Sequence, residues 1–310
     1  WGRDRGIFME SMIVGDVAEL TDNQGTLTLF TNDKGGMNDD IIVTKTDQGY
    51  LYGVSNAGCA DKDSANMKVS NGHGVDLEFL EECLIARTSM AQVLQSGLTD
   101  DLSKLTFMTS TLATVFGTQG CRLTRCGSPG EDGVEISVPK SGVVAVTEHL
   151  LANSEVKLAG LGARDSLRLE AGLCLYGNDI DDSTTPVEAT LLWTIGKRRL
   201  QAKDFPSAEI ILPQIKAKTA RKRVGLVCVW IAFEIRFNFH FICFFCPSPC
   251  LKQNIAMGYV DAPYAKNGTP IQVEVRKKPV VTKMPFMPTN YYSQWTPSLC
   301  DQPACQWTVT

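Results

Sequence analysis

The sequence predicts an α+β fold, in which antiparallel sheets and helices occupy successive stretches of the chain. Apolar and polar residues alternate with a period of two in a first group of short runs, which turn residues separate. A stretch with helical spacing follows at residues 76–102, and a second group of alternating runs comes after it. The 310 residues suffice for one large domain or two medium ones.

Composition and motifs narrow the range of functions. Charged residues of both signs are mixed and the formal net charge is −4, which argues against a nucleic-acid-binding protein. The sequence has no Walker loop, no Gly-x-Gly-x-x-Gly after a strand, no Gly-x-Ser-x-Gly and no His-Glu-x-x-His. Its eleven cysteines lack the spacing of a disulfide framework, so we expect most of them to be reduced. The densest cluster, at 243–250, has no histidine pair beside it, and we expect thiols there and no metal.

The first helix is predicted at residues 6–20, where Met9, Ile13 and Val17 recur at helical spacing and Gly15 is the weak point. Alternation then predicts three strands, with turn residues between the first two. These strands are 26–30, 41–44 and 50–55. The short loops between them make an antiparallel meander the expected arrangement.

Asn38, Asp39 and Asp40 stand at the start of the second of these strands. Adjacent carboxylates at a turn are usually solvated, whereas a carboxylate directed into a pocket handles protons or positions an amine. Neighbouring residues of a strand face opposite sides, so we expect only one of Asp39 and Asp40 to point inward. Asn56, just after the third strand, is by itself typical of a turn. The residues alone leave both interpretations of the aspartate pair open.

Two further strands are predicted at 121–126 and 133–138, joined by a glycine-rich turn. In the second strand Val134 and Ile136 belong to the apolar side, which places Glu135 on the other face. That face is either solvated, as in many antiparallel sheets, or the wall of a pocket.

A helix is predicted at 163–171, with Gly160 and Gly162 before it and Gly172 at its C-terminal cap. Arg164 lies in its first turn, where the helix dipole disfavours a cation. We therefore expect an anionic or carbonyl-rich partner for Arg164. That partner is either another side chain in a buried salt bridge or a ligand oxygen at the edge of a pocket.

Two later segments also leave alternatives open. The basic residues at 197–199 and 216–223 are either a solvated face or a surface that attracts an acidic partner. Residues 227–245 are apolar enough for a membrane span, but apolar and polar residues alternate from 233 to 241. A helix would turn these polar groups towards lipid, so we predict a strand, or sequence foreign to the fold, and no membrane span.

One long match goes beyond these patterns. The run Gly162-Ala-Arg-Asp-Ser-Leu-Arg-Leu-Glu-Ala-Gly172 and the following Leu175-Tyr-Gly-Asn-Asp179 closely resemble the signature of the aminomethyltransferase, or T-protein, family of the glycine cleavage system. The resemblance extends from about residue 9 to about residue 227 and resumes over 246–292. The resumed part contains strand-like runs at 254–260, 269–276 and 280–286.

This resemblance implies a folate-binding GcvT-type domain of antiparallel sheets with helices over 1–200, with the N-terminal part missing. It implies a small C-terminal β-barrel domain over 201–292, atypical at 227–245, and an unmatched tail at 293–310. The first residue is Trp1, so we expect a fragment or a processed form whose transit peptide lies outside this chain. The family likeness places the protein in the mitochondrial matrix.

The activity that the resemblance implies is transfer of a one-carbon unit from the aminomethyl-lipoyl carrier protein to tetrahydrofolate, the co-substrate. The expected products are 5,10-methylenetetrahydrofolate and ammonia. The expected partners are the lipoyl carrier (H) protein and the other components of the glycine cleavage system. Two alternatives are a folate-binding relative without transferase activity and the folate half of a dimethylglycine or sarcosine dehydrogenase.

The resemblance also assigns roles to single residues. Asp40, in its Gly-Gly-x-x-Asp-Asp context, matches the catalytic aspartate of the family. Glu135 matches the pterin-binding glutamate, and a pterin presents an amino group and a ring N–H that one carboxylate accepts together. Arg164 matches the arginine of the same site. The other folate-site residues that the resemblance suggests are Asn56, Tyr176 and Tyr291.

The chain departs from the family pattern in two places. Ser128-Pro129 stand where the family usually has Tyr-Thr, which removes an aromatic side chain near the ligand. Residues 86–90 stand where the family commonly has a Gln-Gly-Pro turn, which changes the local junction between helix and strand.

Overall fold

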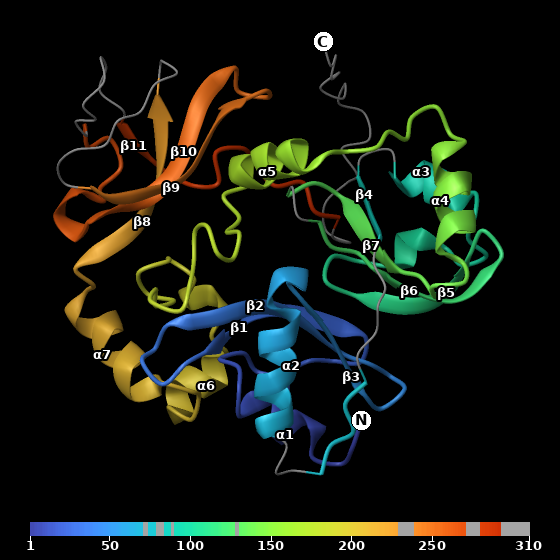
Figure 1. The fold of residues 1–310 in the computed structure, drawn as a ribbon, viewed down its shortest axis with the longest axis horizontal. Helices are drawn as coiled ribbons and strands as arrows, with labels where there is room; N and C mark the ends of the chain where they lie inside the picture. Colours follow the sequence, from blue (N-terminus) through green and yellow to red (C-terminus); the bar gives the residue numbers. More distant parts are fainter. Residues whose placement is uncertain are drawn as a thin grey trace.

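The protein is described by a computed structural model for residues 1–70, 74–78, 84–87, 90–127, 130–228, 239–270 and 280–292. Three antiparallel sheets lie around the middle of the molecule, with helices beside and between them (Figure 1). This arrangement confirms the predicted α+β class. None of the helices in the described ranges is long and apolar enough to cross a bilayer. Ser128 and Pro129 lie outside the described residues.

The first sheet has the order β1-β2-β3 and is antiparallel throughout, which confirms the predicted meander. Its strands are β1 (Gln24–Thr31), β2 (Met37–Lys45) and β3 (Leu51–Ser55). A short 3-10 helix, η1 (Ala57–Cys59), leads from β3 into the helix α2 (Ala60–Val69). Phe30, Ile41 and Val43 of the sheet pack in one apolar core with Phe8 and Ile13 from the start of the chain.

The helix predicted at 6–20 is only partly correct. α1 (Arg5–Glu10) ends at Glu10, and the chain then runs beside β1, where the Val14 N–H donates to the Leu29 carbonyl. Gly15 permits this close approach, because a Cβ there would lie 2.7 Å from the hydroxyl oxygen of Thr28. The apolar residues of this segment are buried as expected, but pairing with a strand edge replaces the helix.

The second sheet has the order β4-β7-β6-β5. Its strands are β4 (Leu84–Arg87), β5 (Ser110–Val115), β6 (Thr118–Thr124) and β7 (Gly133–Ser137). The helices α3 (Met90–Gln95) and α4 (Val143–Leu151) contribute to the apolar core on this sheet, and η2 (Leu102–Lys104) precedes β5. The predicted pair of strands at 121–126 and 133–138 is confirmed as β6 and β7.

The helix predicted over 76–102 is wrong at residues 84–87. These residues form β4, which pairs with β7 so that Leu84 lies opposite Ile136. Only α3 and the short η2 turn are helical among the described residues of that stretch. The free edge of β7 offers backbone hydrogen bonds to β4, and this pairing overrides the local helical spacing.

The helix α5 (Leu161–Glu170) lies between the second and third sheets (Figure 1). It confirms the helix predicted at 163–171, although it begins two residues earlier and includes Gly162. Gly172 closes it with a φ of +68°, a left-handed conformation that glycine adopts without strain. Further along come η3 (Leu192–Thr194), α6 (Lys197–Ala202) and α7 (Ala208–Ala217).

The third sheet has the order β11-β8-β10-β9, and η4 follows its strand β10. Its elements are β8 (Arg221–Cys228), β9 (Phe239–Ser248), β10 (Gln253–Asp261), η4 (Ala262–Tyr264) and β11 (Val280–Thr282). The strand predicted within 227–245 is confirmed for 239–245, which pair with β10, while 229–238 lie outside the described residues. The strand predicted at 254–260 is confirmed as β10, and that at 280–286 is confirmed over 280–282. Most of 269–276 and all of 293–310 lie outside the described residues.

The basic residues near residue 200 divide into two groups. Lys216, Lys218 and Lys222 are exposed, as expected for a solvated face. Arg199 and Arg223 are only 2% and 6% exposed, so the solvated interpretation is wrong for them. Their guanidinium groups bind main-chain carbonyls that would otherwise be buried without a donor, as the arginine fork permits.

Candidate functional site

One asparagine holds the two adjacent aspartates of β2. The side-chain amide of Asn56 donates to Asp39 Oδ1 at 2.8 Å and to Asp40 Oδ1 at 2.9 Å, and its main-chain N–H donates to Asp39 Oδ2 at 3.1 Å. Pairing of β3 with β2 ends at Ser55 opposite Ile41, so Asn56 is free to turn towards the beginning of β2. Asp39 alternates with Asp40 as expected, since Asp39 is buried like Ile41 and Val43 while Asp40 is not, yet a single amide reaches both carboxylates.

The two carboxylates nevertheless differ in exposure. Asp39 is 0% exposed, whereas Asp40 is partly exposed. Burial and the neighbouring charge of Asp39 raise the pKa of Asp40 to about 6, and the hydrogen bond from Asn56 opposes this rise. Asp40 is therefore mostly ionised at neutral pH, yet its pKa lies close enough to neutrality for proton transfer in both directions.

Lys62 of α2 fastens Tyr176 to the beginning of β2. Its ammonium group donates to the Tyr176 hydroxyl at 2.8 Å and to the main-chain carbonyl of Asn38, and it lies 4.2 Å from the centre of the Tyr176 ring. Burial raises the pKa of the Tyr176 hydroxyl, so it remains protonated at neutral pH. Asp40, Asn56 and Tyr176 thus form a first cluster, which also contains Asp39 and Lys62.

Glu135 belongs to a second cluster, in which the charge of Arg164 acts on its carboxylate. Glu135 lies on β7 opposite Thr124 of β6, and the Cys126 thiol forms a hydrogen bond with its carboxylate. Burial raises the pKa of Glu135, while this hydrogen bond and the nearby charge of Arg164 oppose the rise. The face of β7 that carries Glu135 is thus half-buried and charged, as a pocket wall would be.

Tyr291 belongs to this second cluster. Its ring stacks on Phe107 with a centroid distance of 3.9 Å and an interplanar angle of 21°. Burial and the nearby Cys126 raise the pKa of the Tyr291 hydroxyl, and Cys126 is also the neighbour of Glu135. The Asn290 N–H donates to the Gly130 carbonyl, which holds this end of the chain along the second sheet.

One continuous segment contributes to both clusters. Residues 161–181 comprise α5, which carries Arg164, and the turn that carries Tyr176. Cys174 lies between them. Burial is the main cause that raises the pKa of its thiol to about 11, and the charge of Asp40 adds to this rise. This segment connects the first and second sheets through the middle of the molecule (Figure 1).

Arg168 anchors this connecting segment from within. Its guanidinium group pairs with Asp165 at 2.7 Å, pairs with Asp179, and donates to the Leu173 carbonyl at 3.1 Å. Asp179 also accepts from the Leu175 N–H at 2.8 Å, and its own carbonyl accepts from the Tyr259 hydroxyl at 2.7 Å. These contacts fix the path of the chain from α5 to the turn at Tyr176.

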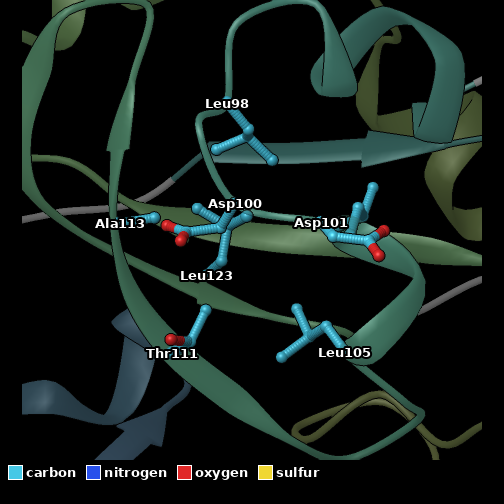
Figure 2. Close-up of a pocket in the computed structure, with 8 residues that line it drawn as sticks. Leu98, Asp100, Asp101, Leu105, Thr111, Ala113 and Leu123 are labelled. Carbon is cyan, nitrogen blue, oxygen red and sulfur yellow. The ribbon is translucent and has the colours of Figure 1, made fainter.

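The pocket shown in Figure 2 is separate from both clusters. It encloses about 230 Å³ including space open to solvent, and leucines make up half of its lining residues. Asp101 at its rim already accepts from the Ser103 N–H and hydroxyl. None of the residues predicted for the folate site is among its lining residues.

Thiols and metals can be judged for the described residues. Six cysteines of the described ranges are free thiols, namely Cys59, Cys121, Cys126, Cys174, Cys246 and Cys250. Across the described ranges, no group of three or more His, Cys, Asp and Glu side chains is placed to hold a metal ion.

Sequence reasoning missed Lys62 and the burial of Asp39 in the first cluster, and it missed Asp63, which lies next to Asp39. Lys62 and Asp63 lie on α2, of which the only buried residue is Asp63. A helix without an apolar stripe is normally exposed to solvent. If such a helix packs against another element, the residues that it buries there are polar. The missing apolar stripe in 60–69 was the available signal, although it does not say which residue is buried.

Comparison with known proteins agrees with this architecture. The family model described as GCVT N-terminal domain matches residues 1–199, and that described as glycine cleavage T-protein C-terminal barrel domain matches 241–288. Mitochondrial aminomethyltransferase of Homo sapiens is 55% identical over 94% of this chain and 77% of its own length. That of Gallus gallus is 58% identical over 94% and 79%, and that of Pisum sativum 45% over 94% and 76%. The crystal structure of the glycine cleavage system aminomethyltransferase T from Bartonella henselae aligns with a TM-score of 0.83 at 31% identity, covering 94% of this chain and 84% of that one.

Proposed function

The chain belongs to the aminomethyltransferase, or T-protein, family of the glycine cleavage system, and we propose that its two polar clusters serve that reaction on one bound folate. The reaction moves a one-carbon unit, carried as an aminomethyl group on a lipoyl arm, to tetrahydrofolate and releases ammonia. Identities of 45% to 58% with aminomethyltransferases favour this function over the folate half of a dimethylglycine or sarcosine dehydrogenase. The observation that carries the proposal is that Arg164 lies near enough to Glu135 for its charge to act on that half-buried carboxylate, although the two are 29 positions apart in the sequence.

The second cluster suits the pterin end of folate. Glu135 accepts one weak hydrogen bond from Cys126, which leaves acceptor capacity on a half-buried carboxylate. The 2-amino group and ring N–H of a pterin are the pair of donors that such a carboxylate accepts. Arg164 adds donors for a ring oxygen, and the stacked Phe107 and Tyr291 supply an aromatic surface beside it. We therefore place the pterin against Glu135 and Arg164.

The first cluster suits proton handling. Bound folate supplies the amine that receives the one-carbon unit. Asp40 positions that amine and takes up its proton, because it is ionised at neutral pH and held by only one side-chain amide. Asn56 fixes the direction of the Asp40 carboxylate, and Tyr176, held by Lys62, forms the edge of the site. In this scheme the protein contributes orientation and electrostatics.

Partners and compartment follow from the same family membership. We propose that the lipoyl carrier protein delivers the aminomethyl group, and that the exposed Lys216, Lys218 and Lys222 attract an acidic partner. The relatives at 45% to 58% identity are mitochondrial enzymes by name, which supports the mitochondrial matrix as the compartment. We also propose a domain boundary near residue 200, between the two family matches.

Tetrahydrofolate is expected to raise the melting temperature of the protein. A ligand at about 100 times its Kd stabilises the folded state by about 2.7 kcal/mol, which differential scanning fluorimetry detects. Glu135→Gln presents an N–H to a donor of the pterin, so we expect folate affinity to fall by ~10- to 100-fold, as for loss of a charged hydrogen bond. Glu148→Gln, the same change on the exposed side of α4, is the matched control. An unchanged shift in Glu135→Gln contradicts the pterin assignment, and the lack of any shift in the wild type contradicts the proposed function.

The transfer rate is expected to fall below pH 6. Asp40 acts in its ionised form, and its pKa is raised to about 6, so kcat/KM should decrease tenfold per pH unit below that value. Single-turnover transfer from aminomethylated carrier protein between pH 5 and 8 measures this dependence. Folate binding measured at the same pH values is the control, since Glu135 also titrates at acid pH. A rate that stays constant down to pH 5 contradicts the role of Asp40.

A further inference from the structure

A third carboxyl group lies behind the aspartate pair. Asp63, on the inner side of α2, is 2% exposed and forms a hydrogen bond with Asp39, which is itself 0% exposed. Ser55, at the end of β3, also forms a hydrogen bond with Asp63. The order from the buried side towards the site is therefore Asp63, Asp39, Asn56 and Asp40.

Two buried carboxyl groups in contact cannot both be ionised. Burial and the contact with Asp39 raise the pKa of Asp63 to about 7. With both groups ionised, Oδ2 of Asp63 is buried without a hydrogen-bond partner among the described residues. A proton between the two carboxyl groups supplies the missing donor, and this proton removes the repulsion as well.

The proton belongs on the Asp63 side of this pair. Asp39 already accepts two hydrogen bonds from Asn56, one from the main-chain N–H and one from the side-chain amide. A protonated Asp39 would lose part of this acceptor capacity, whereas a protonated Asp63 adds a further donor beside those of Asn56 and the Cys59 thiol. Both hydrogens of the Asn56 amide are then in use, one on Asp39 and one on Asp40.

We propose that Asp63 is a positioning residue for aminomethyl transfer. Its protonated carboxyl group donates a hydrogen bond to Asp39, and Asp39 holds Asn56 so that the side-chain amide of Asn56 directs Asp40. This role rests on the function proposed above for Asp40. The other ionisable groups that act on this part of the structure are Lys62 on the same helix and Cys59 before it. Lys62 is engaged by Tyr176 and Asn38, and burial raises the pKa of Cys59 to about 11, so both keep their protons throughout the pH range of the test.

The rate test compares a variant that keeps a donor with one that removes it. Asp63→Asn retains an N–H donor towards Asp39, so we expect kcat at pH 7.5 within ~3-fold of the wild type. Asp63→Leu removes the donor at similar size, and release of Asn56 should lower kcat by ~10- to 100-fold, the effect of a misplaced catalytic group. Asp61→Asn and Asp61→Leu, on the exposed side of the same helix, are the matched controls.

The pH profile separates positioning from a structural role. The hydrogen bond from Asn56 lowers the pKa of Asp40, so its loss in Asp63→Leu should move the acid limb of kcat to higher pH. The limb should stay in place in Asp63→Asn and in both Asp61 variants. Equal loss of kcat in Asp63→Asn and Asp63→Leu with an unmoved limb indicates a structural role and overturns the proposal. Full kcat in Asp63→Leu overturns it too.

A stability measurement tests the shared proton without any assay of transfer. The folded-state pKa of Asp63 is raised from its ordinary 3.8 to about 7, so this group makes the folded state less stable as the pH rises through that interval. The decrease in melting temperature from pH 5 to pH 7.5 should therefore be smaller in Asp63→Asn than in Asp61→Asn. Equal decreases overturn the proposal even if Asp63→Leu fails to fold or if the wild type shows no transferase activity.

Discussion

Asp40→Asn is expected to lower kcat for aminomethyl transfer by ~10²- to 10⁴-fold, the range for removal of a general acid or base. Asparagine is nearly the same size, and its carbonyl oxygen can still accept the hydrogen bond from Asn56, so the site should keep its shape. The amide cannot take up a proton, and that step is lost. Affinity for tetrahydrofolate should change by less than about threefold, because in the proposed site the pterin is held by Glu135 and Arg164 and not by Asp40.

Single-turnover transfer and a folate titration on the same preparation measure these two quantities. Asp33→Asn, in the exposed turn between β1 and β2, removes the same charge and should leave both unchanged. Wild-type transfer in Asp40→Asn would remove Asp40 from the mechanism. A parallel loss of folate binding would instead make Asp40 a binding residue.

Arg168→Met is expected to lower the free energy of unfolding by ~3–5 kcal/mol, the typical effect of removing one partner of a buried ion pair. The side chain of Asp179 is 0% exposed and would lose its ionic partner. Asp165 would lose a pairing at 2.7 Å, and the Leu173 carbonyl would lose its donor. Urea unfolding followed by circular dichroism measures the change.

Arg164→Met, one turn earlier on the same helix, is the matched comparison. Arg164 is exposed, so its replacement should change the free energy of unfolding by no more than about 0.5 kcal/mol. The same replacement should weaken folate binding, since Arg164 lies beside Glu135. If Arg168→Met is as stable as Arg164→Met, the buried ion pairs do not hold the connecting segment in place.

The elements predicted correctly are those that turn residues or glycines delimit at both ends. The run at 26–30 alternates and stops at a turn, and α5 ends at Glu170, shortly before Gly172, whose left-handed conformation closes the helix. Ile13 and Val14 lie in a stretch with helical spacing but pair with β1, and residues 84–87 likewise pair with β7. Spacing reports which residues are buried, and the partner that buries them decides the backbone conformation.

The site was only partly predictable for a similar reason. Residue types placed Asp40, Glu135 and Arg164 among the candidates, but only the family resemblance chose between their solvated and functional interpretations. The approach of Arg164 to Glu135 across elements was not visible in any local pattern. Asp63 and the buried Arg199 and Arg223 were missed because a charged residue is predicted to be exposed to solvent unless its partner is known. Those partners lie on other elements, so no local pattern reveals them.

The terminal sheet also holds α5. Glu170, the last residue of that helix, accepts from Ser248 and from the Cys250 N–H through its carboxylate, and its carbonyl accepts from the N–H groups of Phe286 and Met287. Residues 248–250 and 286–287 thus support the C-terminal end of α5. A chain that ends before residue 246 would lack these four hydrogen bonds to the end of α5, the helix that carries Arg164. Substitutions at Ser248 or deletion of 286–287 should therefore disturb the part of the proposed folate site to which Arg164 belongs.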